Sequence, residues 1–528
     1  MELTSLYFIA FVLLSCLIYY IVPKKIQWCV LLVSSLAFFV MSSGILTVYM
    51  LAATMIIYLG ALWLNKKSED FEAHKKDMEK AERKAAKKQL KKAQKLRLAL
   101  IVVAVLGILV VLKYCNLGVE IANFFNGIFH TGVTFEKFSI ILPLGISYYS
   151  LMAVSYVTDV YRGIIKAEKN PLRVLLFVSY FPHIVEGPFD RYKDLSAQFN
   201  VPHKFDYDSF CKGMILVVLF GFFKKMVIAD RLGITVSEVF NNAQNHSGPV
   251  IVIATVMYTF QLYCDFSGCI DIVSGVSELF GIKVAENFRQ PFFSKSINEF
   301  WRRWHITLGL WLKEYVYYPV ILSGHFKAVD KFAKKHLKSN HLINVIPAAY
   351  ALFFVWFSNG LWHGASMKYI LYGLYYYFLM MLGELCKPLF EKMKDKLHIK
   401  EGNKPFAIFQ MLRTFVIVNI GMLLFRSETV KEFAGLLKQS VSSFYVIEAV
   451  KETIGPSKEV VFAFGGLCVL LIVSIIKEKY NDRTVRDLLY TKSFLIRYIL
   501  ILLLITSILV LGVYGPGYNA ADFVYAQF

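Results

Sequence analysis

Long runs of apolar residues, separated by short polar or basic segments, dominate this chain. The runs are apolar on all sides instead of alternating at the helical period, which is typical of helices in a membrane. About ten of them approach the length that crosses the hydrocarbon core of a bilayer. These predicted spans are residues 3–22, 26–41, 45–64, 98–115, 138–157, 342–362, 369–386, 405–425, 460–476 and 494–513.

The middle third of the chain is less regular. Residues 172–185 form a short apolar run that continues into prolines, which favours a re-entrant or half-helix element lining a cavity. Residues 213–223 are also a short run, and we expect the lysine pair at 224–225 to stop it. The longer run 250–281 contains Asp265 and Asp271, which predict an interruption, either a polar interior face or a helix boundary.

We therefore predict an all-α fold: a polytopic transmembrane protein with about ten full spans, plus re-entrant and interfacial helices around a central tunnel. The whole chain, residues 1–528, is expected to form a single integral membrane domain. The first run begins Met1-Glu2 without basic residues, so it is expected to be retained as a span and not removed as a signal peptide.

Basic loops predict the orientation of the spans. Residues 65–97 are rich in Lys and Arg, lack Gly and Pro, and are expected to form a solvated helix; residues 387–404 are also basic. Loops rich in Lys and Arg stay in the cytoplasm, so both loops are predicted to be cytoplasmic and both termini to lie outside a cell (plasma) membrane. Binding of acidic lipid by residues 65–97 is the less favoured interpretation.

Composition agrees with this class. The chain is 57% hydrophobic and 16% aromatic, with a mean hydropathy of +0.52. Its net charge of +20 comes from the basic loops, and no basic face with stacking aromatic groups indicates nucleic-acid binding. The eight cysteines are scattered without a CxxC pair, which favours small buried side chains over a disulfide framework or a zinc site.

Two histidines stand out. His363 lies in the stretch SNGLWHGA, residues 358–365, between two apolar runs, and glycines on either side of it allow close approach of backbone or substrate. An ionisable residue at membrane depth is a functional candidate because hydrocarbon makes it costly. A lone histidine is more often satisfied by neighbouring helices. The second histidine, His305 in FWRRWH at 300–305, strengthens the functional interpretation.

The segment around His305 predicts a helix. Ser296 followed by Glu299 is a capping box, and Glu299 and Arg303 are spaced to pair. An aromatic stripe along this helix is typical of an amphipathic helix at the membrane interface, although the same helix could wall a tunnel with His305 facing inward. The stripe comprises Trp301, Trp304, Leu308, Trp311 and Tyr315.

Other catalytic patterns are absent from the sequence. It has no GxSxG, Walker, HExxH or GxGxxG pattern in a suitable context, and no metal-ligand cluster with a suitable spacing. The remaining chemistry is a histidine acting as general base on a hydroxyl, without a metal or a bound prosthetic group.

These motifs resemble the membrane-bound O-acyltransferase family, specifically its alginate O-acetyltransferase-like branch. The resemblance is strongest over residues 140–375, the expected catalytic core. The matching motifs are FPH at 181–183 with GP at 187–188 and RY at 191–192, DFSG at 265–268, ENF at 286–288, FWRRWH at 300–305, LWHGA at 361–365 and the ending FVYAQF at 523–528.

The resemblance implies that His363 is the catalytic histidine and His305 the second signature histidine. It implies transfer of an acyl group, expected to be acetyl, from a cytoplasmic thioester such as acetyl-CoA to a cell-surface polysaccharide, as in exopolysaccharide biosynthesis. An extracytoplasmic partner with an SGNH-hydrolase-like fold is expected to complete the transfer. The residues expected to line the donor tunnel or bind substrate are Trp362, Asn287, Arg302, Trp304, Asp265 and His183.

Two departures from the family pattern concern the acceptor. The Trp that often follows His-Gly-Ala is replaced by Met367-Lys368-Tyr369, and the Leu-Gly-Gly-Asn-Arg that often follows the interface helix is absent, with VILSG at 320–324 in its place. One alternative is D-alanyl transfer from a carrier protein to teichoic acid. Another is a transporter or flippase that uses Asp265, Asp271 and His363 as a proton or substrate path.

Overall fold

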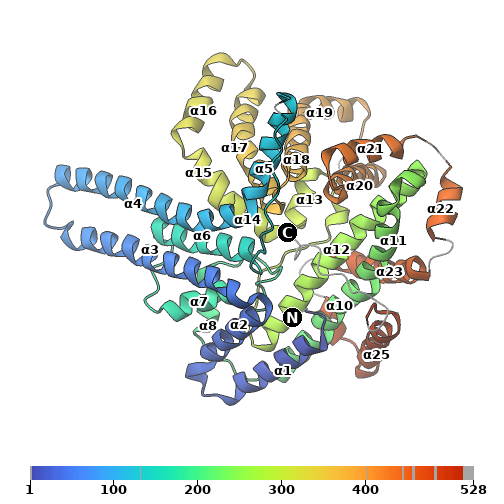
Figure 1. Cartoon of the computed structure of the whole chain (residues 1–528), viewed down its shortest axis with the longest axis horizontal. Helices are drawn as coiled ribbons and strands as arrows, with labels where there is room; N and C mark the ends of the chain where they lie inside the picture. Colours follow the sequence, from blue (N-terminus) through green and yellow to red (C-terminus); the bar gives the residue numbers. More distant parts are fainter. Residues whose placement is uncertain are drawn as a thin grey trace. The chain divides into compact units, whose positions relative to one another are not determined.

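Helices make up the regular structure of this protein. The computed structural model describes residues 3–130, 132–400, 402–442, 445–454, 458–480 and 485–514 (Figure 1). Over these residues the chain forms helices and no β-sheet, with one isolated antiparallel bridge between Phe288 and Trp304. The all-α membrane class is confirmed. The ending 523–528, part of the predicted resemblance, lies outside the described residues.

Seven helical stretches of the described residues are long and apolar enough to cross a membrane. They are Lys24–His74, Lys80–Ile128, Gly248–Leu279, Asn340–His363, Lys404–Arg426, Lys458–Lys479 and Phe494–Leu511. The pair Met367–Leu385 and Lys387–Lys396, bent by 53°, makes eight if it is one span.

Fewer helical stretches meet this criterion of length and apolarity than the ten spans that were predicted, and the reasons are local. The predicted spans 26–41 and 45–64 fall in the single stretch Lys24–His74. The first helix, Leu6–Ile21, has 16 residues and is too short to count. The helix Ile146–Arg162 has 17 residues, and nearly all of its side chains are buried in protein.

The chain divides into two compact units. The first is Met1–Gly213 with Val276–Ala285, and the second is Met214–Gly275 with Glu286–Phe528. The helices of the first unit are α1 (Leu6–Ile21), α2 (Gln27–Ser43), α3 (Thr47–His74), α4 (Lys80–Leu109), α5 (Cys115–Ile128), α6 (Ile146–Arg162), α7 (Pro171–Ser179), α8 (Tyr192–Phe199) and α9 (Tyr207–Cys211).

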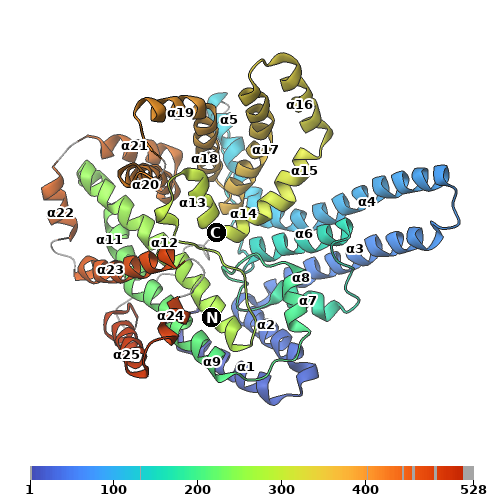
Figure 2. The same ribbon diagram turned by 180° about the vertical axis from the view of Figure 1, so that it is seen from behind.

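The basic segment 65–97 forms the end of a helical hairpin in the first unit. Helices α3 and α4 lie side by side in both views (Figures 1 and 2), and α6 packs against both. Gln94 of α4 ties the hairpin together by donating to the Leu64 carbonyl (3.3 Å) and to Ser68 Oγ (2.5 Å). The segment was predicted to be one helix, but a turn at residues 75–79 divides it between α3 and α4. Its side of the membrane stays a prediction.

A buried non-helical segment follows α7. Asn170 caps this helix by accepting from Leu172 N, and the helix ends at Ser179, so the predicted short, broken element is confirmed. Residues 180–190 are then all buried. The Phe181 ring packs against Phe11, Phe38 and Phe280 at centroid distances of 5.4, 6.0 and 6.0 Å. Irregular backbone is tolerated at membrane depth when protein covers it.

The second unit contains the remaining helices. They are α10 (Leu219–Phe222), α11 (Asp230–Asn241), most of α12 (Gly248–Leu279), α13 (Ile297–Arg303), α14 (Ile306–Leu312), α15 (Tyr318–Ile321), α16 (Gly324–His336), α17 (Asn340–His363), α18 (Met367–Leu385), α19 (Lys387–Lys396), α20 (Lys404–Arg426), α21 (Val430–Ser440), α22 (Val446–Ile454), α23 (Lys458–Lys479), α24 (Val485–Tyr490) and α25 (Phe494–Leu511).

One prediction for this unit was wrong, and the structure decides another between its two alternatives. The two lysines at 224–225 do not stop a helix; they lie in a π-helical segment, Phe223–Ala229, between α10 and α11. Asp265 and Asp271 do not mark a helix boundary, because α12 runs unbroken from Gly248 to Leu279; both carboxylates bind lysines, as the alternative of a polar interior face predicts. The opposite charges pair with each other, so none of them has to reach water.

Lys225 and its two carboxylate partners are the most buried of these charged groups. Lys225 Nζ lies 2.7 Å from Asp265 Oδ1 and 2.9 Å from Asp230 Oδ1, and all three side chains are at most 5% exposed. Lys224 Nζ lies 2.5 Å from Asp271 Oδ2, whose side chain is 28% exposed. Removing one partner of a fully buried pair leaves an uncompensated charge, whereas a partly exposed carboxylate is easier to solvate.

We predict that Lys225→Met lowers the free energy of unfolding by about 3–5 kcal/mol, because two carboxylates are left buried without their cation. Thermal unfolding of the purified protein in detergent measures this. Lys224→Met is the matched control and should cost less. Adding Asp230→Asn and Asp265→Asn to Lys225→Met should recover most of the loss. A Lys225→Met variant as stable as the wild type would show that the cluster does not hold α12.

Candidate functional site

His305 lies at a sharp break between two short helices. Ser296 caps helix α13, which begins at Ile297; its Oγ accepts from Glu299 N (3.2 Å), as the capping box predicts. Glu299 Oε2 accepts from Lys295 N (2.9 Å), whereas in a standard capping box it would accept from the backbone N–H of the capping residue. The helix ends at Arg303, and α14 begins after His305, which has a left-handed φ of +49°. A non-glycine residue adopts this conformation only when its surroundings hold it there.

The predicted aromatic stripe therefore does not run along one helix. The break at His305 places Trp301 on α13, and Leu308 and Trp311 on α14. Trp304, Leu308 and Trp311 are buried, so the stripe packs inside the second unit and does not form the predicted interfacial face. Trp304 stacks on Phe300 (5.5 Å) and meets the edge of Phe288 (5.1 Å).

Asn287 organises the break. Its Oδ1 accepts from Thr307 N (3.1 Å) and Thr307 Oγ1 (2.8 Å), and its backbone carbonyl accepts from Ile306 N (3.0 Å). The same Oδ1 lies 3.1 Å from His305 Nδ1. Since a backbone N–H can only donate, Oδ1 is an acceptor, and Nδ1 of His305 must carry the hydrogen. In the neutral ring, Nε2 is then the nitrogen that carries no hydrogen.

The His305 ring is held in its neutral form. The side chain is 2% exposed, and this burial, together with the charge of His363 in its protonated form, lowers the pKa of His305 well below the ordinary value of histidine. A neutral imidazole with a proton fixed on Nδ1 can accept a hydrogen bond, or a proton, at Nε2. His305 can therefore orient a hydroxyl group or share the work of a general base.

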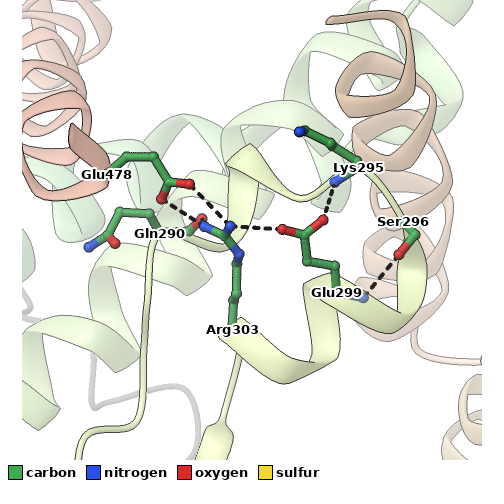
Figure 3. Close-up of polar contacts among 6 residues, drawn as sticks. All are labelled: Gln290, Lys295, Ser296, Glu299, Arg303 and Glu478. Carbon is green, nitrogen blue, oxygen red and sulfur yellow. Dashed lines mark hydrogen bonds and ion pairs between the residues drawn. The ribbon is translucent and has the colours of Figure 1, made fainter. Parts of the chain in front are cut away.

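An ion cluster around Arg303 anchors the segment before His305 (Figure 3). Arg303 donates to Glu299 Oε1 (2.7 Å), to both carboxylate oxygens of Glu478 (2.8 and 3.1 Å) and to the Gln290 carbonyl (3.4 Å). The predicted Glu299–Arg303 pair is confirmed. Glu478, at the end of α23, lies 175 residues further along the chain, and no local pattern points to it.

His363 is the last residue of α17 and is 3% exposed. Its ring is enclosed by aromatic rings at centroid distances of 4.9 Å (Trp362), 5.5 Å (Tyr372) and 5.3 Å (Phe425). Helices α17 and α18 approach closely here: a Cβ on Gly360 would lie 2.4 Å from the Tyr369 carbonyl oxygen. The predicted role of glycine in allowing close packing at this stretch is thus confirmed for Gly360.

The ring of Trp362 contacts the rings of both histidines. Its ring centroid lies 5.3 Å from that of His305 and 4.9 Å from that of His363. Phe266 of α12 closes the other side of His305 at 4.8 Å. Of the predicted site residues, the structure therefore gathers His305, His363, Trp362 and Asn287, with Trp304 bordering the group through Phe288.

Three predicted site residues have other surroundings or belong to the first unit. The carboxylate of Asp265 binds Lys225, so its role in the structure is to pair a buried charge. Arg302 is exposed, whereas its neighbour Arg303 makes the ion cluster. His183 belongs to the first unit, where it is buried and its Nδ1 lies 3.7 Å from Asp190 Oδ2.

The sequence analysis did not single out several residues that surround the two histidines. Asn359 lies one turn before His363 on α17 and is 4% exposed, and its four-residue spacing could have revealed it. Phe425, Tyr372 and Phe266 are apolar or aromatic residues within predicted spans, and no sequence signal separates them from ordinary packing residues. Among the described residues, no group of three His, Cys, Asp or Glu side chains could hold a metal ion.

A family model for the membrane-bound O-acyltransferase (MBOAT) family matches residues 36–334, more than half of the chain. This chain belongs to the MBOAT family. The matched residues include Asn287 and His305, and the match ends before His363. The predicted family resemblance is thereby confirmed.

Three curated relatives of this MBOAT protein are named for alginate, peptidoglycan and teichoic acid. The probable alginate O-acetylase AlgI of Pseudomonas syringae is 34% identical over 346 residues, 65% of this chain and 60% of that protein. The peptidoglycan O-acetyltransferase of Helicobacter pylori is 29% identical, over 58% of each chain. The teichoic acid D-alanyltransferase of Bacillus subtilis is 31% identical over 53% of this chain and 68% of its own. The chain thus spans about 60% of the length of the AlgI relatives it matches.

The Arg303 cluster generates a stability prediction. Arg303→Ala should lower the free energy of unfolding by about 2 kcal/mol, because two carboxylates and a carbonyl lose a charged donor. Arg289→Ala is the matched control: its pair with Glu286 is more than half exposed, so its loss should cost less than about 1 kcal/mol. Thermal unfolding in detergent compares them, and equal losses would contradict an anchoring role for Arg303.

Proposed function

We propose that this protein is an O-acyltransferase that takes an acyl group, acetyl in the leading form of the proposal, from a cytoplasmic thioester such as acetyl-CoA. The acceptor is a cell-surface polysaccharide outside the plasma membrane. The observation that carries the proposal is that two buried histidines, His305 and His363, both contact the ring of Trp362. The names of the relatives support acyl transfer to an envelope polymer.

In the proposed reaction, His363 acts as the general base. Its neutral imidazole takes the proton of an acceptor hydroxyl, whose oxygen attacks the thioester carbonyl carbon. The C–S bond then breaks, and the thiolate takes the proton back from His363, giving an ester and a free thiol. His305, with Nδ1 fixed on Asn287, presents Nε2 to orient the acceptor. The donor thioester enters as a substrate, and side chains carry out every proton transfer.

The two alternatives predict different chemistry. D-alanyl transfer to teichoic acid uses the same proton steps with another donor, and one relative carries that name. Transport through Asp265 and Asp271 is less favoured, because both carboxylates are paired with lysines. Consumption of the thioester by the purified protein separates either acyl transfer from transport.

The first prediction of this proposal concerns His363. His363→Ala should lower acyl transfer on the order of a hundredfold or more, because the general base is lost. His325→Ala, at an exposed histidine of α16, is the matched control and should leave transfer unchanged. The O-acetyl content of cell-surface polysaccharide is measured at equal protein level. Wild-type O-acetylation in the His363→Ala cells would remove His363 from the catalytic role.

The proposal includes an extracytoplasmic partner with an SGNH-hydrolase-like fold. A polysaccharide needs an extended groove outside the bilayer, and the longest mixed outer segment of the sequence, residues 426–458, contains the short helices α21 and α22 in its described part. The partner would receive the acyl group near His363 and pass it to the polymer.

Reconstitution in vesicles tests the partner. The purified chain with acetyl-CoA and candidate polysaccharides should produce little acetylated polymer, because the groove that aligns the polymer is missing. Adding extracytoplasmic extract from the native cells should restore acetylation, and the same extract with His363→Ala vesicles is the control. Efficient acetylation of polymer by the chain alone would contradict the partner and indicate a one-component transferase.

A further inference from the structure

Asn359 is a buried polar residue next to the proposed catalytic base. It lies on α17, four residues before His363, and the two side chains are 4% and 3% exposed. Residues four apart on a helix lie on the same face, one turn from each other. Asn359 therefore faces the same side of α17 as the ring of His363.

The side-chain amide of Asn359 has an unused donor. Its Nδ2 atom is buried and has no hydrogen-bond partner among the residues that the structure describes. Buried amides are hydrogen-bonded in the great majority of native structures, since a buried donor without an acceptor destabilises the fold. A leucine of similar size would avoid that loss at this position, so packing alone does not explain an asparagine here.

Acyl transfer is accelerated by a hydrogen-bond donor at the thioester carbonyl. When an alcohol oxygen attacks a thioester, the carbonyl oxygen becomes an oxyanion, which N–H groups placed in advance stabilise strongly in a site without water. The contacts of the His363 ring are mostly aromatic, from Trp362, Tyr372 and Phe425. The amide of Asn359 adds a neutral N–H donor on the same helix face.

We propose that Asn359 Nδ2 donates a hydrogen bond to the carbonyl oxygen of the acyl thioester and stabilises the oxyanion that forms there. This inference rests on the proposed function. The acceptor oxygen bonds to the carbonyl carbon, its proton moves to His363, and the carbonyl electron pair moves to the oxygen facing Asn359. When that pair returns, the C–S bond breaks and the thiolate leaves with the proton from His363.

The test is Asn359→Leu, with Asn344→Leu as the matched control. Asn344 is an exposed asparagine on the same helix. Release of free thiol from acetyl-CoA is measured in membrane vesicles from the native cells, which retain any partner. Asn359→Leu should lower kcat about 100- to 1,000-fold with KM for the donor little changed. Its thermal midpoint should equal or exceed that of the wild type, since an unpaired buried amide is removed.

A second donor makes the test specific to the oxyanion. In the dithioester analogue of acetyl-CoA, sulfur replaces the carbonyl oxygen and accepts hydrogen bonds poorly. Wild type and Asn344→Leu should turn over the thioester much faster than the dithioester, and Asn359→Leu should lose most of this preference. The ratio of the two rates does not depend on the amount of folded protein, so Asn359→Ala can be compared even if the leucine variant folds poorly.

The outcomes separate the inference from the proposal beneath it. If the wild type releases no thiol from acetyl-CoA or from a D-alanyl thioester, the proposed function fails. If the wild type is active and both Asn359 variants keep its kcat and its preference for the thioester, the oxyanion role of Asn359 is overturned. A variant that loses stability and kcat but keeps the full preference shows a structural role and also overturns it.

Discussion

The hydrogen bonds of Asn287 determine the geometry of the candidate site. One amide oxygen accepts from the backbone and hydroxyl of Thr307 and from His305, and the backbone carbonyl of Asn287 accepts from Ile306. These bonds hold His305 in a left-handed conformation that it would not adopt alone. They also fix which ring nitrogen carries the proton. Without Asn287, the segment from Trp301 to Tyr315 could continue as the single helix that its aromatic pattern predicts.

The sequence was informative where the controlling interactions are local. The capping of α13 by Ser296 and the Glu299–Arg303 pair follow from spacings of three and four residues, and both were predicted. The apolar runs predicted the all-helical membrane class. Both histidines were singled out because their neighbours are unusual for membrane helices, and the structure places them on either side of Trp362.

Prediction failed where a distant residue decides the outcome. Lys224 and Lys225 were expected to end a helix, and a helix boundary was one of two alternatives for Asp265 and Asp271, because each charge was considered alone. Their pairing across distant segments makes both helices continuous. Glu478 is another distant partner, and no local pattern identifies it as the partner of Arg303. Asn359 is a local case: its position one turn before His363 is readable from the sequence.

The proposed acyl transfer requires the reactive carbonyl of the thioester to lie near His363 and His305. An experimental structure with a ketone analogue of acetyl-CoA, in which a methylene group separates the sulfur from the carbonyl carbon, tests this most directly. We predict that the carbonyl carbon lies beside His363, with its oxygen within hydrogen-bond distance of Asn359 Nδ2. Analogue bound with its carbonyl away from both histidines, while the wild type turns over acetyl-CoA, would contradict the account.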